Sequence, residues 1–276
     1  MIPQLQFAAN VIATVIATYT DLDKGFIYDW ITYPLIGLGI VLSIVTGQWI
    51  GIVLAALIYG IGLFAYNSGK MGGGDIKLLA GMALVQPLYQ GMIFVLGVLL
   101  VAAVSASIVM SIWFVGRYVL SKPKIKWKTP RKKAAAIGMI LFFVAFYLIT
   151  IQALLPFPIL VIFAVALLFG LVFYALEDEV KAHAFLERIP VEKLEEDELL
   201  AVEHLTHEEK EKWGKDIPTL IGPENVLAFK QKGMHTIPVF RHLPQFAPFL
   251  LMGVLIVYLF PEWIAMIVPT LVINPV

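Results

Sequence analysis

The sequence contains no cysteine, and only 14% of its residues are charged. The absence of cysteine excludes disulfides, thiolate catalysis and zinc sites built on cysteine. A soluble domain has about 25% charged residues, whereas this chain is 60% hydrophobic. No basic residue precedes the first hydrophobic run, although the n-region of a cleaved signal peptide requires one. We therefore interpret the chain as an integral membrane protein whose first hydrophobic run is a retained helix.

Five runs without a charged residue alternate with polar segments along the chain. Because a spanning helix needs about 20 residues, the first and last runs predict one helix each, and the three longer runs predict a hairpin each. Turn residues such as Gln86-Pro87 and Leu155–Pro158 divide the long runs. The prediction is an all-α polytopic membrane protein with about eight hydrophobic helices, the fourth short and buried or re-entrant: 4–20, 31–46, 50–67, 75–86, 88–117, 135–154, 157–176 and 245–268.

The polar segments also suggest a division of the chain into five parts. If the chain changes sides at every helix, all Lys and Arg residues fall in or beside the loops of one side. The segment from Arg117 to Lys133 has eight basic residues and no acidic one, so the positive-inside rule places that side in the cytoplasm of a cell-membrane protein. We expect a catalytic membrane core at 1–117, a basic cytoplasmic loop at 118–134, an additional helical hairpin at 135–176, a cytosolic insert at 177–243 and a C-terminal membrane helix at 244–276.

The segment 177–243 contains all five histidines and 15 acidic residues. Within it, Thr206-His207-Glu208-Glu209 is a capping-box pattern that predicts a helix start, and Gly222-Pro223-Glu224 predicts a short helix to about residue 232. His204 and His207 are three residues apart, but no third ligand has suitable spacing. We expect neither a metal site nor a cofactor.

The residues that suggest chemistry begin with Gly72-Gly73-Gly74-Asp75, at the edge of an apolar segment. A carboxylate at the edge of a membrane segment is energetically unfavourable and therefore suggests a functional role. Consecutive glycines allow another backbone to approach closely. A helix N-cap is the other explanation for Asp75.

Three aspartates follow the first hydrophobic run. Asp29 directly precedes the second run, which predicts an N-cap, and Asp23 beside Lys24 and Gly25 predicts a solvated turn. Asp21 lies nearest the apolar zone, so we prefer it over Asp23 as the partner of Asp75.

The pattern Asp21-Leu22 with Ile27-Tyr28-Asp29, followed by an apolar helix, resembles the first aspartate motif of type IV prepilin peptidases. The stretch Gly72–Leu79 resembles their second motif, Gly-x-Gly-Asp. The likeness covers roughly residues 5–117 and is closest to the archaeal preflagellin (archaellin) and prepilin peptidases. Tyr28 departs from the proline usual in bacteria, and the hairpin at 135–176 is an addition.

The resemblance implies a membrane aspartyl endopeptidase that removes short basic class III signal peptides from preflagellins and prepilins at the cytoplasmic face. It implies that Asp21 and Asp75 are catalytic and that a substrate backbone approaches Gly72, Gly73 and Gly74. Asp29 and Lys77 are candidates for a supporting role. The expected partners are these substrates and the lipid bilayer, with no nucleic acid. Because the chain lacks the cysteine-rich insert of bacterial relatives, no N-methylation is expected.

Two carboxylates close together hold one shared proton near neutral pH. The ionised one activates a water and the protonated one donates to the scissile carbonyl oxygen. Helix dipoles favour an ionised Asp75 at a helix N-terminus and a neutral Asp21 at a C-terminus. Two alternatives stay open. One is a presenilin-like or signal-peptide-peptidase-like protease, whose first aspartate lies inside a helix. The other is a cation-coupled transporter, whose acidic residues lie near the bilayer midplane.

Overall fold

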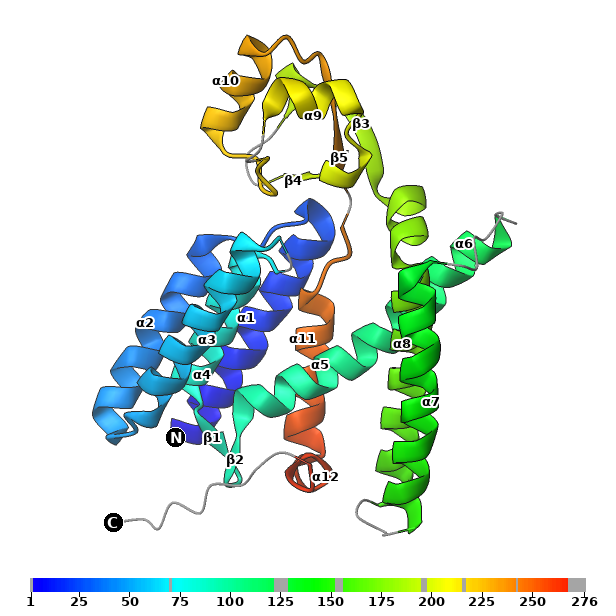
Figure 1. Cartoon of the computed structure of the whole chain (residues 1–276). Helices are drawn as coiled ribbons and strands as arrows, with labels where there is room; N and C mark the ends of the chain where they lie inside the picture. The colour runs from blue at the N-terminus through cyan, green and yellow to red at the C-terminus, as the bar shows by residue number, and fades with distance from the viewer. Residues whose placement is uncertain are drawn as a thin grey trace.

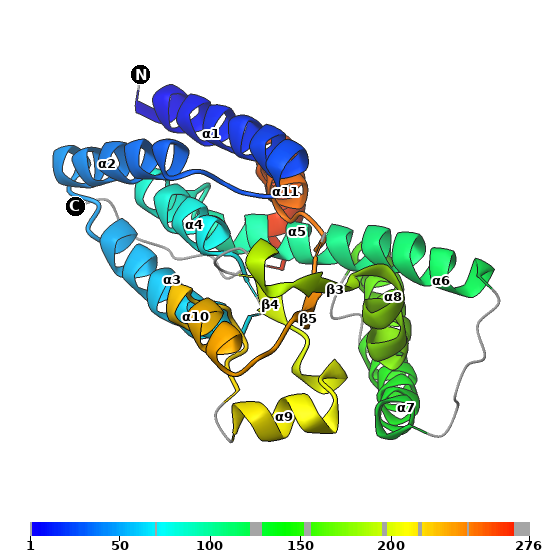
Figure 2. The ribbon, with the colours of Figure 1, turned by 90° about the horizontal axis from the view of Figure 1, so that it is seen from above.

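The computed structural model describes residues 2–69, 71–121, 129–151, 156–194, 198–214, 217–241 and 243–267. They form a bundle of helices, a helical hairpin beside it and a small domain at one end (Figure 1, Figure 2). Each of the eight predicted segments contains a helix, and five helical segments among the described residues are long and apolar enough to cross a membrane. The protein is thus a helical, multi-pass membrane protein.

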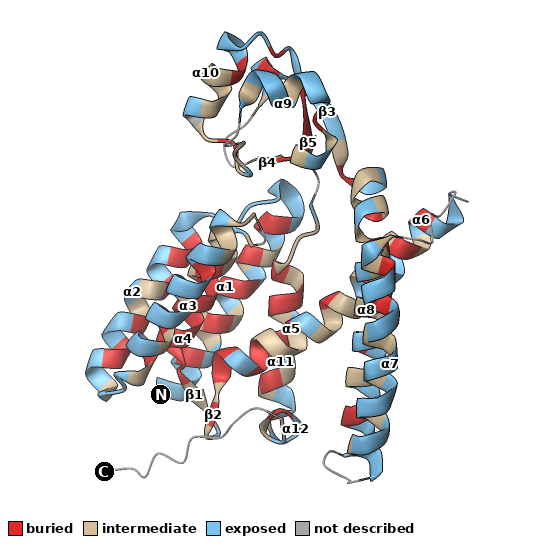
Figure 3. Ribbon diagram, in the orientation of Figure 1, coloured by how far each residue is buried: buried red, intermediate tan, exposed pale blue. Residues whose placement is uncertain are grey.

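The bundle is built around one short helix, α4 (Gly73–Val85). With 13 residues it is about 20 Å long, and every residue from Leu78 to Val85 is buried (Figure 3). This confirms the expectation that the fourth helix is short and enclosed by its neighbours. Those neighbours are α1 (Ile2–Lys24), α2 (Asp29–Thr46), α3 (Ile50–Asn67) and α5 (Phe94–Met110), and α11 (Ala247–Leu259), from the far end of the chain, packs against α1 and α5.

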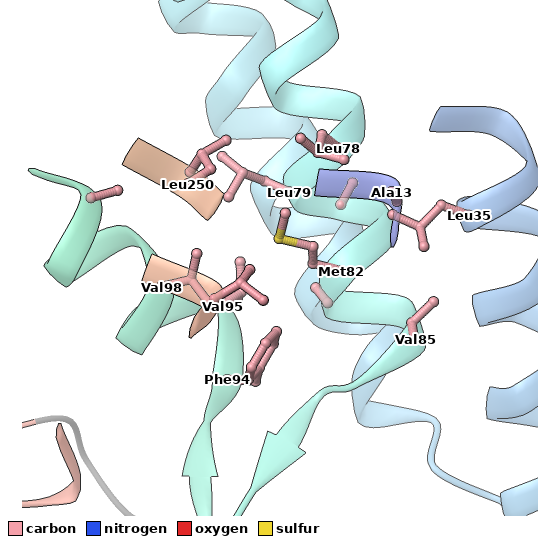
Figure 4. Close-up of a cluster of buried hydrophobic side chains, with 14 of the residues drawn as sticks. Ala13, Leu35, Leu78, Leu79, Met82, Val85, Phe94, Val95, Val98 and Leu250 are labelled. Atoms are coloured by element: carbon pink, nitrogen blue, oxygen red, sulfur yellow. The ribbon is translucent and has the colours of Figure 1, made fainter. Parts of the chain in front are cut away.

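Small residues bring the helices of the bundle close to α4. A β-carbon added at Gly81 of α4 would lie 2.8 Å from Leu35 of α2, and one added at Gly62 of α3 would lie 2.5 Å from Ile76. Membrane helices commonly pack closely at glycines. In lipid the hydrophobic effect does not drive helices together, so close van der Waals packing has to stabilise their contact. On its other side α4 meets α11 and α5 (Phe94–Met110), where Met82 packs in one cluster with Leu250, Val95 and others (Figure 4).

The chain after α4 differs from the prediction, which placed the start of a helix at residue 88. Instead, β1 (Leu88–Tyr89) and β2 (Met92–Ile93) form a hairpin. Gln90 and Gly91 have φ angles of 48° and 81°, and a two-residue type I′ turn requires positive φ at both positions. The fifth helix therefore begins at Phe94 and continues through η1 (Ser111–Val115), a π-helical turn, into α6 (Gly116–Leu120).

The hairpin of α7 (Pro130–Ile151) and α8 (Phe157–Ala184) stands beside the bundle, and α5 to α6 slant between them (Figure 1). Both helices extend beyond the predicted bounds: α7 starts at a proline, which suits the first helical position, and α8 continues through charged residues. Arg131 at the start of α7 pairs with Glu177 near the end of α8. Residue 155, at the start of the predicted turn 155–158, and residues 122–128 of the predicted basic loop lie outside the described residues.

Residues 185–241, which we call the insert domain, connect α8 to α11. Their three antiparallel strands have the order β3-β5-β4, a sheet that was not predicted. The strands are β3 (Leu186–Pro190), β4 (Leu199–Leu200) and β5 (Thr236–Phe240), accompanied by the 3-10 turns η2 (Val191–Lys193) and η3 (Val202–His204).

The two helices predicted in this region are confirmed as α9 (His207–Trp213) and α10 (Pro223–Gln231). Thr206 and Glu209 form the expected capping box at α9, since the Thr206 backbone N–H donates to the Glu209 carboxylate and the Glu209 N–H donates to the Thr206 hydroxyl.

The last predicted helix, 245–268, is interrupted. α11 ends at Leu259, and α12 (Pro261–Ala265) starts after Phe260, whose φ and ψ of −131° and 52° are not helical. Pro261 explains the break because a proline has no N–H to donate and disfavours helical geometry in the residue before it. Residues 268–276 of the predicted C-terminal segment lie outside the described residues.

Candidate active site

Asp21 lies in the last turn of α1, so the prediction that the first helix ends before Asp21 is wrong. The helix continues to Lys24, and Gly25 ends it with a φ of 75° and an N–H that bonds to the Asp21 carbonyl at 2.8 Å. This left-handed glycine is a common helix stop, whereas the first charged residue is not one. The Asp21 side chain is buried, and its Oδ2 accepts a hydrogen bond from the Ala247 backbone N–H at 3.0 Å.

The donor to Asp21 comes from the opposite end of the chain. Ala247 is the first residue of α11 and is 226 positions from Asp21. The first N–H groups of a helix lack partners within it, and the dipole makes that end positive, so both effects favour a carboxylate there. In the sequence, the proline after Ala247 is a signal of a helix start, but no signal connects that start with Asp21.

Asp75 is the third residue of α4, whose N-cap is Gly72. The N-cap interpretation of Asp75 is therefore wrong by three positions. One of its carboxylate oxygens, Oδ2, lies beside Gly72, where an added β-carbon would be 3.0 Å from it. The other oxygen, Oδ1, is buried and has no hydrogen-bond partner among the described residues. The charge of Asp21 acts on Asp75, so the fold brings the two carboxylates within electrostatic range of one another.

The three glycines before Asp75 have different surroundings. A β-carbon at Gly74 would lie 2.7 Å from the Ile27 β-carbon and 2.8 Å from the Ile27 carbonyl oxygen. Gly74 therefore packs against the loop between α1 and α2, and the close approach there is made by the chain itself. A β-carbon at Gly73 would only touch the Tyr66 ring at 3.7 Å, and Gly72 is exposed. A β-carbon at Gly72 would lie 3.0 Å from Asp75 Oδ2, so this glycine is close to the carboxylate itself.

The candidates for a supporting role, Asp29 and Lys77, form an ion pair. The Lys77 Nζ lies 2.5 Å from Asp29 Oδ1 and 5.0 Å from the centre of the Tyr33 ring. The pair connects the start of α2 with the first turns of α4. The predicted N-cap role of Asp29 is wrong: the N-cap is Tyr28, and Asp29 is the first helical residue and makes no cap bond.

Asp23 differs from Asp21 in its exposure and in its partner. It is exposed and forms an ion pair with the adjacent Lys24 at 3.3 Å. Its surroundings favour the preference for Asp21 as the partner of Asp75. No group of three or more His, Asp or Glu side chains able to hold a metal ion occurs in the described parts of the chain.

Residues 8–115 match the model of the type IV leader peptidase family. The match includes both aspartates and the glycines between them, and it ends before the α7–α8 hairpin, the insert domain and α11. Neither the curated proteins nor the solved structures contain a match to this chain. Over residues 8–115, which include Asp21 and Asp75, this multi-pass membrane protein is therefore similar to the type IV leader peptidase family.

Proposed function

We propose that the protein is a membrane aspartyl endopeptidase that removes short basic leader peptides from prepilins or preflagellins. One observation carries the proposal. Asp21 and Asp75, far apart in the sequence, lie within electrostatic range of one another in a segment that matches leader peptidases. Two carboxylates that share a proton are the chemistry that an aspartyl protease uses to attack a peptide bond with water.

We propose different tasks for the two carboxylates because their surroundings differ. A buried ionised oxygen without a donor is costly, so we place the shared proton on Asp75, whose Oδ1 has no partner among the described residues. Asp21 is the ionised member because a helix N–H donates to it. This reverses the assignment made from the sequence, which considered only the end of α1 and not the start of α11 beside Asp21.

In the proposed reaction Asp21 removes a proton from a water molecule, which attacks the scissile carbonyl carbon. Asp75 gives its proton to the carbonyl oxygen as the tetrahedral intermediate forms. As the intermediate collapses, the C–N bond breaks, the proton that Asp21 took from water passes to the leaving amine nitrogen, and Asp75 takes its proton back from the former carbonyl oxygen as the new carboxylic acid forms. An infrared spectrum of the free protein should contain a protonated carboxyl band that is absent in Asp75→Asn. A band that persists in Asp75→Asn and disappears in Asp21→Asn would overturn this assignment.

The aspartates are proposed to face the cytoplasm. Asp21 bonds to Ala247, which starts α11 a few residues after the insert domain. The basic start of α7 pairs with the end of α8, directly before the insert domain. The basic residues and the aspartates are thus at the end of the molecule where the insert domain lies (Figure 1). The positive-inside rule supports a cytoplasmic location for this end.

Two observations bear on the alternative functions, the presenilin-like protease and the cation-coupled transporter. Asp21 lies inside a helix, so its position no longer separates leader peptidases from presenilin-like proteases; the family match favours the former. Against a transporter, the carboxylates lie in terminal turns of α1 and α4, whereas transporter sites lie near the midplane.

The test is co-expression with tagged prepilin and preflagellin substrates whose basic leader ends in glycine, followed by the gel shift on processing. Asp21→Asn and Asp75→Asn should each abolish processing. Asp23→Asn is the matched control and should process like the wild type, because Asp23 is exposed and paired with Lys24. Processing at the wild-type rate by either of the first two variants would refute the aspartate pair. A substrate whose leader has neutral residues in place of the basic ones tests the specificity.

A further inference from the structure

We infer that the insert domain is a positioning element for the aspartate pair and that it contacts the loop before Gly72-Gly73-Gly74 through Leu199, which meets Gly69. The inference rests on the proposed peptidase function, and it deepens that function by assigning a task to a part of the chain outside the family match.

The first observation is a contact between the insert domain and the loop that leads to Asp75. Gly69 has a φ of 65°, and a β-carbon added to it would overlap the Leu199 side chain and lie 3.4 Å from Thr219 Cγ2. The leucine side chain therefore rests on the backbone of the loop, three residues before Gly72. In Figure 1 the strand β4, which holds Leu199, is the part of the insert domain that faces the bundle.

The second observation is that this leucine is not needed by the core of its own domain. The neighbouring Leu200 is buried at 3% exposure within the cluster of the insert domain, while Leu199 does not belong to that cluster. Successive residues of a strand point to opposite faces, so Leu199 points away from the domain core. A large apolar side chain on that face is explained by its contact with Gly69.

The third observation connects the same strands with Asp21. β4 pairs with β5 through Leu199 and Phe240, and the chain from Phe240 leads to Ala247, whose N–H bonds to Asp21. Arg241 fixes this exit, because its guanidinium bonds to the Glu198 carboxylate at 2.5 Å and to the Lys193 carbonyl at 3.0 Å. One sheet thus contacts the loop before Asp75 through β4 and precedes the group that holds Asp21 through β5.

Leu199 reaches Gly69 and acts on Asp75 only through the glycine run, so it is a positioning residue. Leu199→Ala should lower kcat by about tenfold with little change in KM, because a small misplacement of a catalytic group costs up to about a hundredfold in rate. The variant should also change the pH profile of kcat, which a loss of folded protein alone does not do. Leu199→Met keeps the volume of the side chain and should restore most of the rate.

A matched control is available in the same domain. Leu227 of α10 is 62% exposed, so Leu227→Ala makes the same chemical change without a contact to lose. It should keep the wild-type kcat, KM and pH profile. Thermal unfolding of each variant in detergent tests whether the compared proteins are folded.

The absence of cysteine allows a direct test of the contact. Gly69→Cys combined with Leu199→Cys should form a disulfide under mild oxidation, which a thiol-labelling gel shift measures without any activity assay. If the insert domain holds the pair in place, the oxidised protein should process substrate at a rate similar to the reduced protein. The two single cysteine variants control for the strain of a side chain at Gly69.

The outcomes separate the inference from the proposed function. A wild type that processes leaders together with a Leu199→Ala variant of unchanged kcat and pH profile refutes the inference alone. Loss of processing on oxidation of the double variant, with recovery on reduction, also refutes it, because the insert domain then has to move. A wild type that processes no leader-bearing substrate refutes the proposed function and this inference with it.

Discussion

The replacement Gly74→Ala tests how the glycine run is held in place. The added methyl carbon would lie 2.7 Å from the Ile27 β-carbon and 2.8 Å from the Ile27 carbonyl oxygen. Because one of these atoms belongs to the backbone, rotation of the Ile27 side chain cannot relieve the overlap. Either the loop between α1 and α2 or the first turn of α4 has to move. The same change at Gly73 would only bring a methyl group into ordinary contact with Tyr66 at 3.7 Å.

The size of the effect follows from two opposing contributions. Alanine is favoured over glycine in a helix by up to about 1 kcal/mol, and overpacking costs about 1–3 kcal/mol. At Gly73 only the first contribution applies, so Gly73→Ala should be neutral or slightly stabilising. At Gly74 the overpacking dominates, and the free energy of unfolding should fall by up to about 2 kcal/mol.

The same displacement should reduce processing, because Asp75 follows Gly74 directly and a shift of about 1 Å at a catalytic group costs up to about a hundredfold in rate. Denaturant unfolding in detergent and the gel-shift assay measure the two effects. Gly73→Ala should remain as stable as the wild type, and its KM should rise if a substrate backbone lies against that glycine. A Gly74→Ala variant with wild-type stability and wild-type processing would refute the packing argument.

Two further predictions concern ion pairs. The pair between Asp29 and Lys77 is partly exposed, so a double-mutant cycle with Asp29→Asn and Lys77→Met should give a coupling energy below about 1 kcal/mol; a coupling several times larger would contradict its partial exposure. In the insert domain, burial acts to raise the pKa of Glu209, but hydrogen bonds from Arg188 and Thr206 outweigh it and hold the pKa below the ordinary 4.5. A lowered pKa stabilises the fold fully above the ordinary value and loses that effect as the pH falls through the folded-state pKa. Glu209→Gln should therefore destabilise the domain by about 1 kcal/mol at pH 7, and urea titrations should show this difference shrinking below pH 4.5.

The helices of the membrane part could be predicted because each is an uncharged run of characteristic length. Their ends could not be predicted where the end depends on backbone conformation rather than on charge. The end of α1 is set by the left-handed Gly25, four residues after the first charged side chain at Asp21. The hairpin at 88–93 was missed because its apolar residues continue the pattern of the neighbouring helix, and only the positive φ of Gln90 and Gly91 reveals the turn.

The sheet of the insert domain could not be predicted for a different reason. β3 and β5 both contain proline, which weakens a strand signal, and their pairing joins residues as distant as Leu186 and Phe240. A strand pairing of this kind is determined by the packing of the whole domain rather than by either segment. The capping box at Thr206 was predictable because it is complete within four consecutive residues.

For the proposed site, the sequence predicts the candidate residues but not the groups that contact them. Asp21, Asp75 and the glycines are recognisable by type and spacing. Their partners Ala247 and Leu199 are an ordinary alanine backbone and an ordinary leucine, and neither has a local signature of its role.

The family match contains both aspartates of the proposed site but not the backbone group that donates to Asp21. Residues 8–115 contain both carboxylates and enclose α4 between α2 and α3, which fixes Asp75 through buried helix packing. Asp21 is different, because it lies in the last turn of an outer helix and takes its hydrogen bond from α11, beyond the match. The Asp21 carboxylate therefore takes its donor from α11 near the end of the chain, whereas Asp75 is positioned by α2 and α3 in the first third of the chain. The relative position of the pair depends on how the insert domain joins α8 to α11, since its sheet contacts the loop of one aspartate and leads to the donor of the other.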